Sequence, residues 1–145
     1  MRSDVLLILF LLPNSANGAQ RRESRRMYDQ PRMRRVRFYH TDTGRKVARE
    51  EYFELPEAGR AALHELFTRY EHGQERRGEV EPVGNGLFEF RVRVANNRFR
   101  AYFFQDGPKY VIVVLCTHKK RPKMDNDDKA LALRRMRDWK RRGVA

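Results

Sequence analysis

The sequence is poor in the residues that form covalent or metal cross-links. Its 145 residues include one cysteine, Cys116, so no disulfide can form within the chain, and a reducing compartment such as the cytoplasm suits it. The four histidines are scattered, and no group of Cys and His residues has the spacing of a zinc site. We therefore expect a protein that uses no metal and no other cofactor.

Long apolar runs are also missing. The run at residues 5–12 has eight residues, whereas a helix needs about 20 to span a bilayer, so we expect no membrane partner. The run is compatible with the core of a signal peptide, but Asp4 and the arginine-rich stretch that follows argue against one. An over-extended translation start is an equal alternative, since Met33 stands directly before the first convincing strand. We expect residues 1–32 to be a disordered basic tail or a mis-assigned start, and residues 33–142 to form the folded domain.

Negative charge is scarce relative to positive charge. Lys and Arg number 32 against 19 Asp and Glu, which gives a formal net charge of +13. The excess lies at two flanks: residues 21–37 hold eight arginines and two acids, and residues 118–142 hold eleven basic residues and four acids. Between Arg45 and Lys109 the charges nearly balance, 12 against 11. This surplus favours a polyanionic partner such as a nucleic acid, although a membrane surface is polyanionic too.

Three consecutive strands are predicted between Leu87 and Lys120. Apolar and polar residues alternate in the first two with the period of two that is typical of half-buried strands, and a turn at residues 95–97 separates them. The polar face of the first strand carries Glu89, Arg91 and Arg93, and that of the second carries Arg98, Arg100 and Tyr102. The third strand, from residue 110, is almost wholly apolar, as in a central strand covered on both faces, and it ends in His118, Lys119 and Lys120.

The remaining pattern predicts one more strand and three helices. A strand at residues 35–40 precedes two helices that meet at Pro56, and residues 79–85 are interpreted as a polar connection. A last helix runs to about Arg142, with Leu133, Met136 and Trp139 able to pack while its arginines, Arg135 among them, stay in solvent. The order β-α-α-β-β-β-α predicts an α+β fold: a small, mostly antiparallel four-stranded sheet with an N-terminal helical hairpin on one face, the arginines on the other face and a C-terminal helix.

At this point the sequence resembles the phage-derived, HigB-like branch of the RelE/ParE toxin superfamily. The matching features are the run LFEFRVRVANNRFRAYFF and a central apolar strand that ends in a lysine pair before a C-terminal helix, and the similarity covers about residues 33–142. The resemblance implies a RelE-like fold and a cytoplasmic type II toxin, an endoribonuclease that cuts mRNA, usually on the ribosome. It also implies a cognate antitoxin, a helix-turn-helix protein of the HigA type.

Metal-independent cleavage of RNA uses the 2′-OH as nucleophile and needs a base, cations around phosphorus and an acid for the departing 5′-oxygen. Arg100 is the first candidate, because the family has an arginine there and a guanidinium fork binds two phosphate oxygens. By the resemblance, Lys120 matches the position that contacts the scissile phosphate, and Lys119 lies beside it. His118 is a candidate for proton transfer. The predicted RNA-binding residues on the same sheet face are Arg91, Arg93, Arg98 and Tyr102.

Each assignment has a plainer alternative. The arginines can pair with Glu89, the lysines can form a solvated turn, and Tyr102 can pack against the last helix. The sequence offers no firm general base. Two other functions therefore stay open: a gyrase-inhibiting ParE-like toxin that cuts no RNA, and a non-enzymatic basic nucleic-acid-binding protein.

Overall fold

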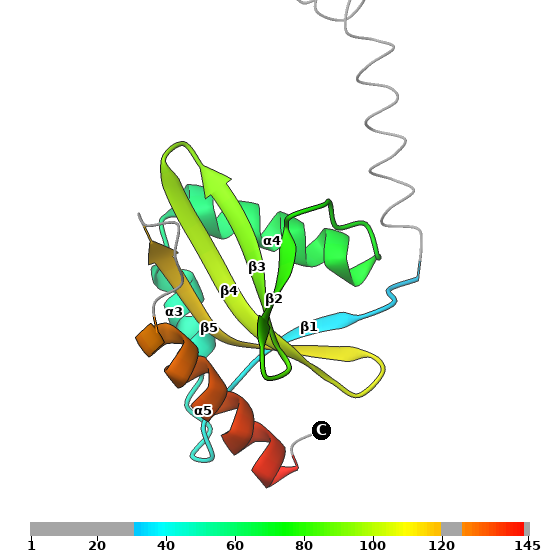
Figure 1. Ribbon diagram of the computed structural model, residues 1–145, viewed down its shortest axis with the longest axis vertical. Coiled ribbons are helices and arrows are strands. Elements are labelled where there is room, and N and C mark those ends of the chain that lie inside the picture. The colour runs from blue at the N-terminus through cyan, green and yellow to red at the C-terminus, as the bar shows by residue number, and fades with distance from the viewer. Residues whose placement is uncertain (1–30, 120–125, 144–145) are drawn as a thin grey trace, which may run out of the picture. The chain divides into compact units, whose positions relative to one another are not determined.

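The described part of the chain is built on a five-stranded mixed sheet (Figure 1). The computed structural model describes residues 31–119 and 126–143, and the fold lies in the compact unit Arg32–Ala145. The strands are β1 (Arg35–Phe38), β2 (Val80–Gly84), β3 (Leu87–Val94), β4 (Asn97–Asp106) and β5 (Tyr110–Lys119). Their order across the sheet is β1-β5-β4-β3-β2, with β1 parallel to β5 and every other neighbouring pair antiparallel. The predicted tail at residues 1–32 falls almost wholly outside the described residues.

The α+β class is confirmed, but the prediction of four strands is wrong by one. The residues interpreted as a polar connection contain the edge strand β2, which pairs with β3. The overlooked signal is Asn85-Gly86, whose φ angles of +59° and +81° are those of a two-residue hairpin turn. Pro82 is tolerated in β2 because an edge strand can lack one backbone donor.

Three helices flank the sheet: α3 (Val47–Glu54), α4 (Glu57–Glu71) and α5 (Asn126–Arg142). Helix α4 packs on β3 and β4, α3 packs along β5, and α5 lies against β4 and β5 from the other side, in front of the sheet in Figure 1. Helix α4 is followed by Gly73, whose φ of +69° is the left-handed conformation that glycine adopts at little cost after a helix. None of the described helices is long and apolar enough to cross a membrane.

Each face of the sheet has its own hydrophobic core, and β4 contributes to both. On the helical-hairpin side, Phe67 of α4 packs against Phe90, and the rings of Phe90 and Phe103 stack with centroids 4.0 Å apart. The core on the α5 side contains Tyr102, Phe104, Ala132, Met136 and Trp139. The predicted alternation of β4 is therefore right, and Arg98 and Arg100 share a sheet face with α5.

A carboxylate on α3 joins α5 to the sheet. Glu51 accepts two hydrogen bonds of 2.9 Å from the guanidinium of Arg135, which also donates to the carbonyl oxygen of Val114 at 2.7 Å. The backbone N–H of Cys116 lies 3.5 Å from Glu51, on the stretch of β5 that extends beyond its pairing with β1. Arg135 was expected to stay in solvent. It is instead a part-buried joint between α3, β5 and α5.

The helical hairpin approaches β4 most closely at Gly59 of α4. A methyl group added there would overlap the ring of Phe99, which is 2% exposed. Gly59→Ala is therefore expected to lower the free energy of unfolding by about 1–3 kcal/mol through overpacking, although alanine is the better helix former by about 1 kcal/mol. Urea unfolding measures the change. In a Phe99→Leu background the same substitution should be tolerated; an equal loss there would contradict the assigned clash.

Candidate nucleic-acid interface

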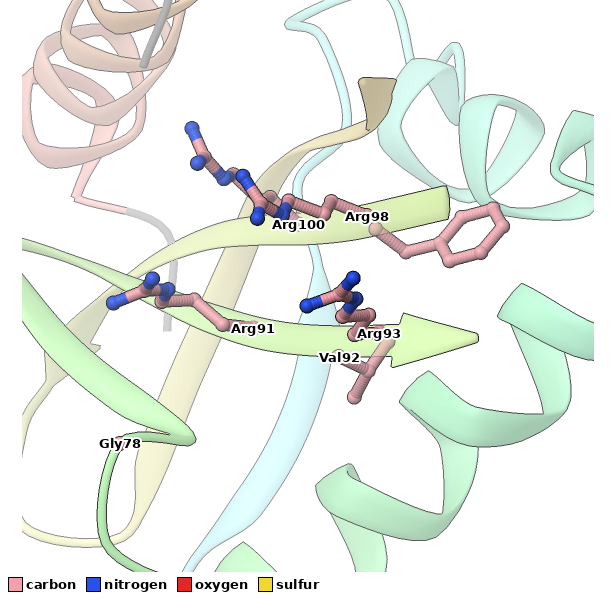
Figure 2. A pocket seen from close by; sticks show the side chains of 7 residues that line it. Gly78, Arg91, Val92, Arg93, Arg98 and Arg100 are labelled. Atoms are coloured by element: carbon pink, nitrogen blue, oxygen red, sulfur yellow. The ribbon is translucent and has the colours of Figure 1, made fainter. Parts of the chain in front are cut away.

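Four arginines on one face of the β3–β4 hairpin form two directly opposed pairs. The strand register places Arg91 opposite Arg100 and Arg93 opposite Arg98. We call these four residues the arginine quartet. Figure 2 shows their guanidinium groups gathered over β3 and β4, while Val92, between two of them in sequence, points to the other side. Regular alternation along two paired strands is sufficient to bring them together.

A pocket of about 310 Å³ lies among these side chains. The quartet lines it together with Val92, Phe99 and Gly78, the last from the connection between α4 and β2. Arg91 is 46% exposed at its side chain, whereas Arg100 is only 3% exposed as a residue. The expectation that Arg100 stands on an open strand face is therefore wrong: it is buried, and it lines the pocket.

Among the residues that the structure describes, Glu89 is an acid in contact with the quartet. Its carboxylate oxygens lie 3.6 Å from Nε of Arg91 and 3.7 Å from Nε of Arg100, and its side chain is 9% exposed. Burial raises the pKa of Glu89 above its ordinary value, against the opposing effects of Arg100 and then Arg91. Sequence reasoning treated Glu89 only as a pairing partner, although its place in the alternation puts it on the arginine face. It is thus a buried carboxylate next to two guanidinium groups.

Opposed like charges destabilise a pair of strands unless something compensates them. Glu89 compensates the pair Arg91 and Arg100. Within the described residues no carboxylate lies within ion-pair distance of Arg93 or Arg98. Arg93 instead donates from Nε to the carbonyl oxygen of Ala95 at 3.1 Å. An anion with several oxygens, such as a phosphate, would relieve this repulsion, so the geometry indicates an anion site.

Tyr102 does not reach the pocket. It is fully buried in the core under α5, so the prediction that it contacts RNA is wrong and the alternative of packing against the last helix holds. Burial raises the pKa of its hydroxyl, and the nearby guanidinium of Arg100 opposes that rise. Tyr102 therefore lies on the same face of β4 as Arg100, within the core under α5. Across the next strand pair Arg100 faces Thr117, whose hydroxyl is buried without a hydrogen-bond partner among the described residues.

His118 lies on the opposite sheet face from the quartet. Its ring stacks on Phe99, with centroids 4.5 Å apart, and its Nε2 is 3.0 Å from Oδ1 of Asn97. Phe99 belongs to the helical-hairpin core, one residue away from Arg98 and Arg100 and therefore on the other side. A role for His118 in proton transfer at the quartet is incompatible with this placement. Successive side chains of a strand alternate between its two faces, so the sequence of β5 could have revealed the placement of His118.

The two predicted lysines have different outcomes. Lys119 lies opposite Arg98 across the β4–β5 pair, so three cations stand side by side on neighbouring strands with Arg93. Its ammonium group is 2.9 Å from a carboxylate oxygen of Asp128, in the first turn of α5, where a negative charge is also favoured by the helix dipole. Lys120 lies outside the described residues. In the part of the chain that the structure describes, no three His, Cys, Asp or Glu side chains converge as metal ligands.

Known proteins resemble the region that carries this interface. Residues 50–137 match the family described as phage-derived protein Gp49-like. The chain is 35% identical over 98 residues to proteins named probable endoribonuclease HigB1 from two strains of Mycobacterium tuberculosis, and each alignment spans 68% of this chain and 78% of the relative. A solved structure of the RelBE2 toxin–antitoxin complex from Mycobacterium tuberculosis matches 64% of this chain and 99% of its own, at 21% identity and a TM-score of 0.41.

Proposed function

Because the chain belongs to the phage-derived Gp49-like family, as the resemblance read from the sequence indicated, we propose that it is the toxin of a type II toxin–antitoxin system and an endoribonuclease that cuts mRNA. The observation that carries this proposal is the arginine quartet, with two opposed guanidinium pairs around one pocket. The name of the 35%-identical relatives, probable endoribonuclease, supports the same chemistry.

In the proposed reaction the 2′-oxygen of one nucleotide attacks the adjacent phosphorus. The bond between the 2′-oxygen and phosphorus forms and the bond to the 5′-oxygen breaks, which leaves a 2′,3′-cyclic phosphate and a 5′-hydroxyl. Arg100 and Arg91 bind the non-bridging oxygens, where negative charge grows in the transition state. Guanidinium groups suit this task because they stay charged and present paired donors.

We assign Glu89 as the acceptor of the 2′-OH proton. It is the carboxylate in contact with Arg91 and Arg100, and a carboxyl whose pKa is raised by burial is a better base near neutral pH than an exposed one. Lys119, beside Arg98, is the proposed source of the proton for the departing 5′-oxygen. The guanidinium and ammonium groups supply the positive charge, so the scheme includes no metal ion.

The proposed partners follow from this chemistry. mRNA is the substrate, and a translating ribosome in the cytoplasm would present it. The basic flanks add affinity for ribosomal RNA. An antitoxin, of the HigA helix-turn-helix type by family resemblance, would inhibit the enzyme by laying an acidic or amphipathic segment over the quartet or by displacing α5. A complex in which the antitoxin touches neither would contradict this.

The gyrase-inhibiting alternative remains the second candidate, since that branch shares the fold class. The opposed arginine pairs favour RNA, because a protein-binding toxin has no need of a pocket lined by four guanidinium groups. A non-enzymatic binder would keep the quartet but would not need Glu89 beside it.

Controlled expression of the full chain, followed by primer extension on several transcripts, tests the proposal. We expect growth arrest and discrete new 5′ ends inside translated regions, and their loss in the double variant Arg91→Gln/Arg100→Gln. The matched control is Arg134→Gln/Arg137→Gln, two exposed arginines of α5 with the same change in charge. Arrest with intact transcripts and a DNA-damage response would instead support gyrase inhibition.

A further inference from the structure

We propose that the quartet binds two consecutive phosphates of one RNA strand: the inner pair, Arg91 and Arg100, holds the scissile phosphate and the outer pair, Arg93 and Arg98, holds its neighbour. The inference rests on the proposed function for the identity of the ligand. It adds a second phosphate subsite and a direction for the strand, which runs along the β3–β4 hairpin.

The spacing of the two pairs carries the first step. Residues 91 and 93 are two apart in β3, as are 98 and 100 in β4, and both pairs are in register on the same face. Two residues advance a strand by about 6.7 Å. This is comparable with the distance between neighbouring phosphates along a single nucleic-acid strand, so one phosphate can stand over each pair (Figure 2).

The charges distinguish the two pairs. The inner pair has Glu89 in contact with both of its members, so its excess positive charge is about that of one guanidinium. For the outer pair, the described residues supply no carboxylate within ion-pair distance, and Lys119 on the neighbouring strand is itself paired with Asp128 at 2.9 Å. A simple electrostatic holder is expected to have such an uncompensated pair, whereas a reaction site needs an acid or base beside its cations.

Position along the hairpin gives the order in which the phosphates enter. Arg100, in the inner pair, is 3% exposed although Arg91 is exposed, and the outer pair lies next to the exposed hairpin turn at residues 95–96. Ala95 has a φ of +53°, an uncommon conformation for a residue with a Cβ, and its carbonyl oxygen accepts the hydrogen bond from Arg93. The turn thus restrains Arg93, one of the two arginines of the outer pair. The strand would first meet the outer pair and then place the next phosphate in the pocket.

The test uses a trinucleotide of 2′-deoxynucleotides without terminal phosphates, which has two phosphodiesters and no 2′-OH to react. Its partner has one phosphodiester replaced by a neutral methylphosphonate. Full-length wild-type protein should bind the fully charged trinucleotide about tenfold or more tightly than the partner, the size of a hydrogen-bonded contact to a charged group. The variant Arg93→Gln/Arg98→Gln should bind both equally, because the remaining phosphate occupies the inner pair in either ligand.

Arg49→Gln, an exposed arginine of α3, is the control and should keep the tenfold ratio. The outer-pair variant should also lower the slope of log affinity against log salt by about 0.7, the value for one phosphate of a single strand. Its midpoint of thermal unfolding should not fall, since the substitution removes two opposed like charges. If the folded outer-pair variant still binds the fully charged trinucleotide about tenfold more tightly than the methylphosphonate partner, the two-phosphate assignment is wrong.

Cleavage of RNA separates this inference from the proposed function. The outer-pair variant should raise KM and leave kcat within a few-fold, because the outer phosphate is bound equally in the ground state and the transition state. If binding of the second phosphate depends on the outer pair but the wild type cleaves no RNA, the proposed function is overturned and the subsite stands. Cleavage without the coupling would overturn the subsite alone.

Discussion

Replacing Arg100 by glutamine is expected to lower kcat for RNA cleavage by about 100- to 1000-fold, the effect of removing one positioned donor to a developing anion. Arg100 lines the pocket, and its side chain is 4% exposed and lies 3.7 Å from the carboxylate of Glu89. It would therefore contact the phosphate from a fixed position. The measurement is single-turnover cleavage of a short RNA at saturating protein, so that a change in affinity does not enter.

Removing Arg100 also leaves the buried carboxylate of Glu89 with Arg91 alone, which costs stability. The double variant Glu89→Gln/Arg100→Gln removes both charges, so it should regain much of that stability and stay inactive. Arg100→Lys keeps one charge but loses the paired donors, and we expect partial activity. Full activity in a folded double variant would show that neither residue contacts the reacting phosphate.

The single variant Glu89→Gln tests the assigned base through the pH profile. An acceptor must be deprotonated, so the wild-type rate should rise with pH through the raised pKa of Glu89 and then level off. The glutamine variant should be slower and should lose that rise. If the rise persists in Glu89→Gln, another group accepts the proton and Glu89 only positions the arginines.

Breaking the joint between Arg135 and Glu51 is expected to have the largest effect on stability. Arg135→Met should lower the free energy of unfolding by about 3 kcal/mol, because it leaves a part-buried carboxylate without its partner. The side chains of Arg135 and Glu51 are 13% and 25% exposed, and two hydrogen bonds of 2.9 Å join them. Equilibrium unfolding in urea measures the loss.

The double variant Glu51→Gln/Arg135→Met should recover part of that loss, since it also removes the unpaired negative charge of Glu51. Arg134→Met, one residue earlier on the exposed side of α5, should change stability by less than about 0.5 kcal/mol. Equal effects at Arg134 and Arg135 would contradict the assigned role. Because α5 covers Tyr102, two residues from Arg100 on the same face of β4, the Arg135 variant should also lower cleavage activity at temperatures where it is still folded.

Several features of this protein follow from its sequence alone. The period of two in β3 and β4 places Arg91, Arg93, Arg98 and Arg100 on one face whatever the rest of the chain does, because successive side chains in a strand alternate. The apolar stripe that ends in Trp139 likewise predicted that the last helix docks by Met136 and Trp139, as it does. The run of β3, β4 and the lysine pair was sufficient for the family resemblance.

The tertiary structure decided which of these residues meet and how far each is buried. Register between strands, which no local pattern gives, opposes arginine to arginine and brings Glu89 to both members of the inner pair. The alternation of side chains in β5 turns His118 away from them, and the core under α5 buries Tyr102. Sequence patterning determines the face on which a side chain lies, because that depends only on its own strand. Burial and partner choice depend on elements far away in the chain, so the reactive arrangement emerges only when they pack together.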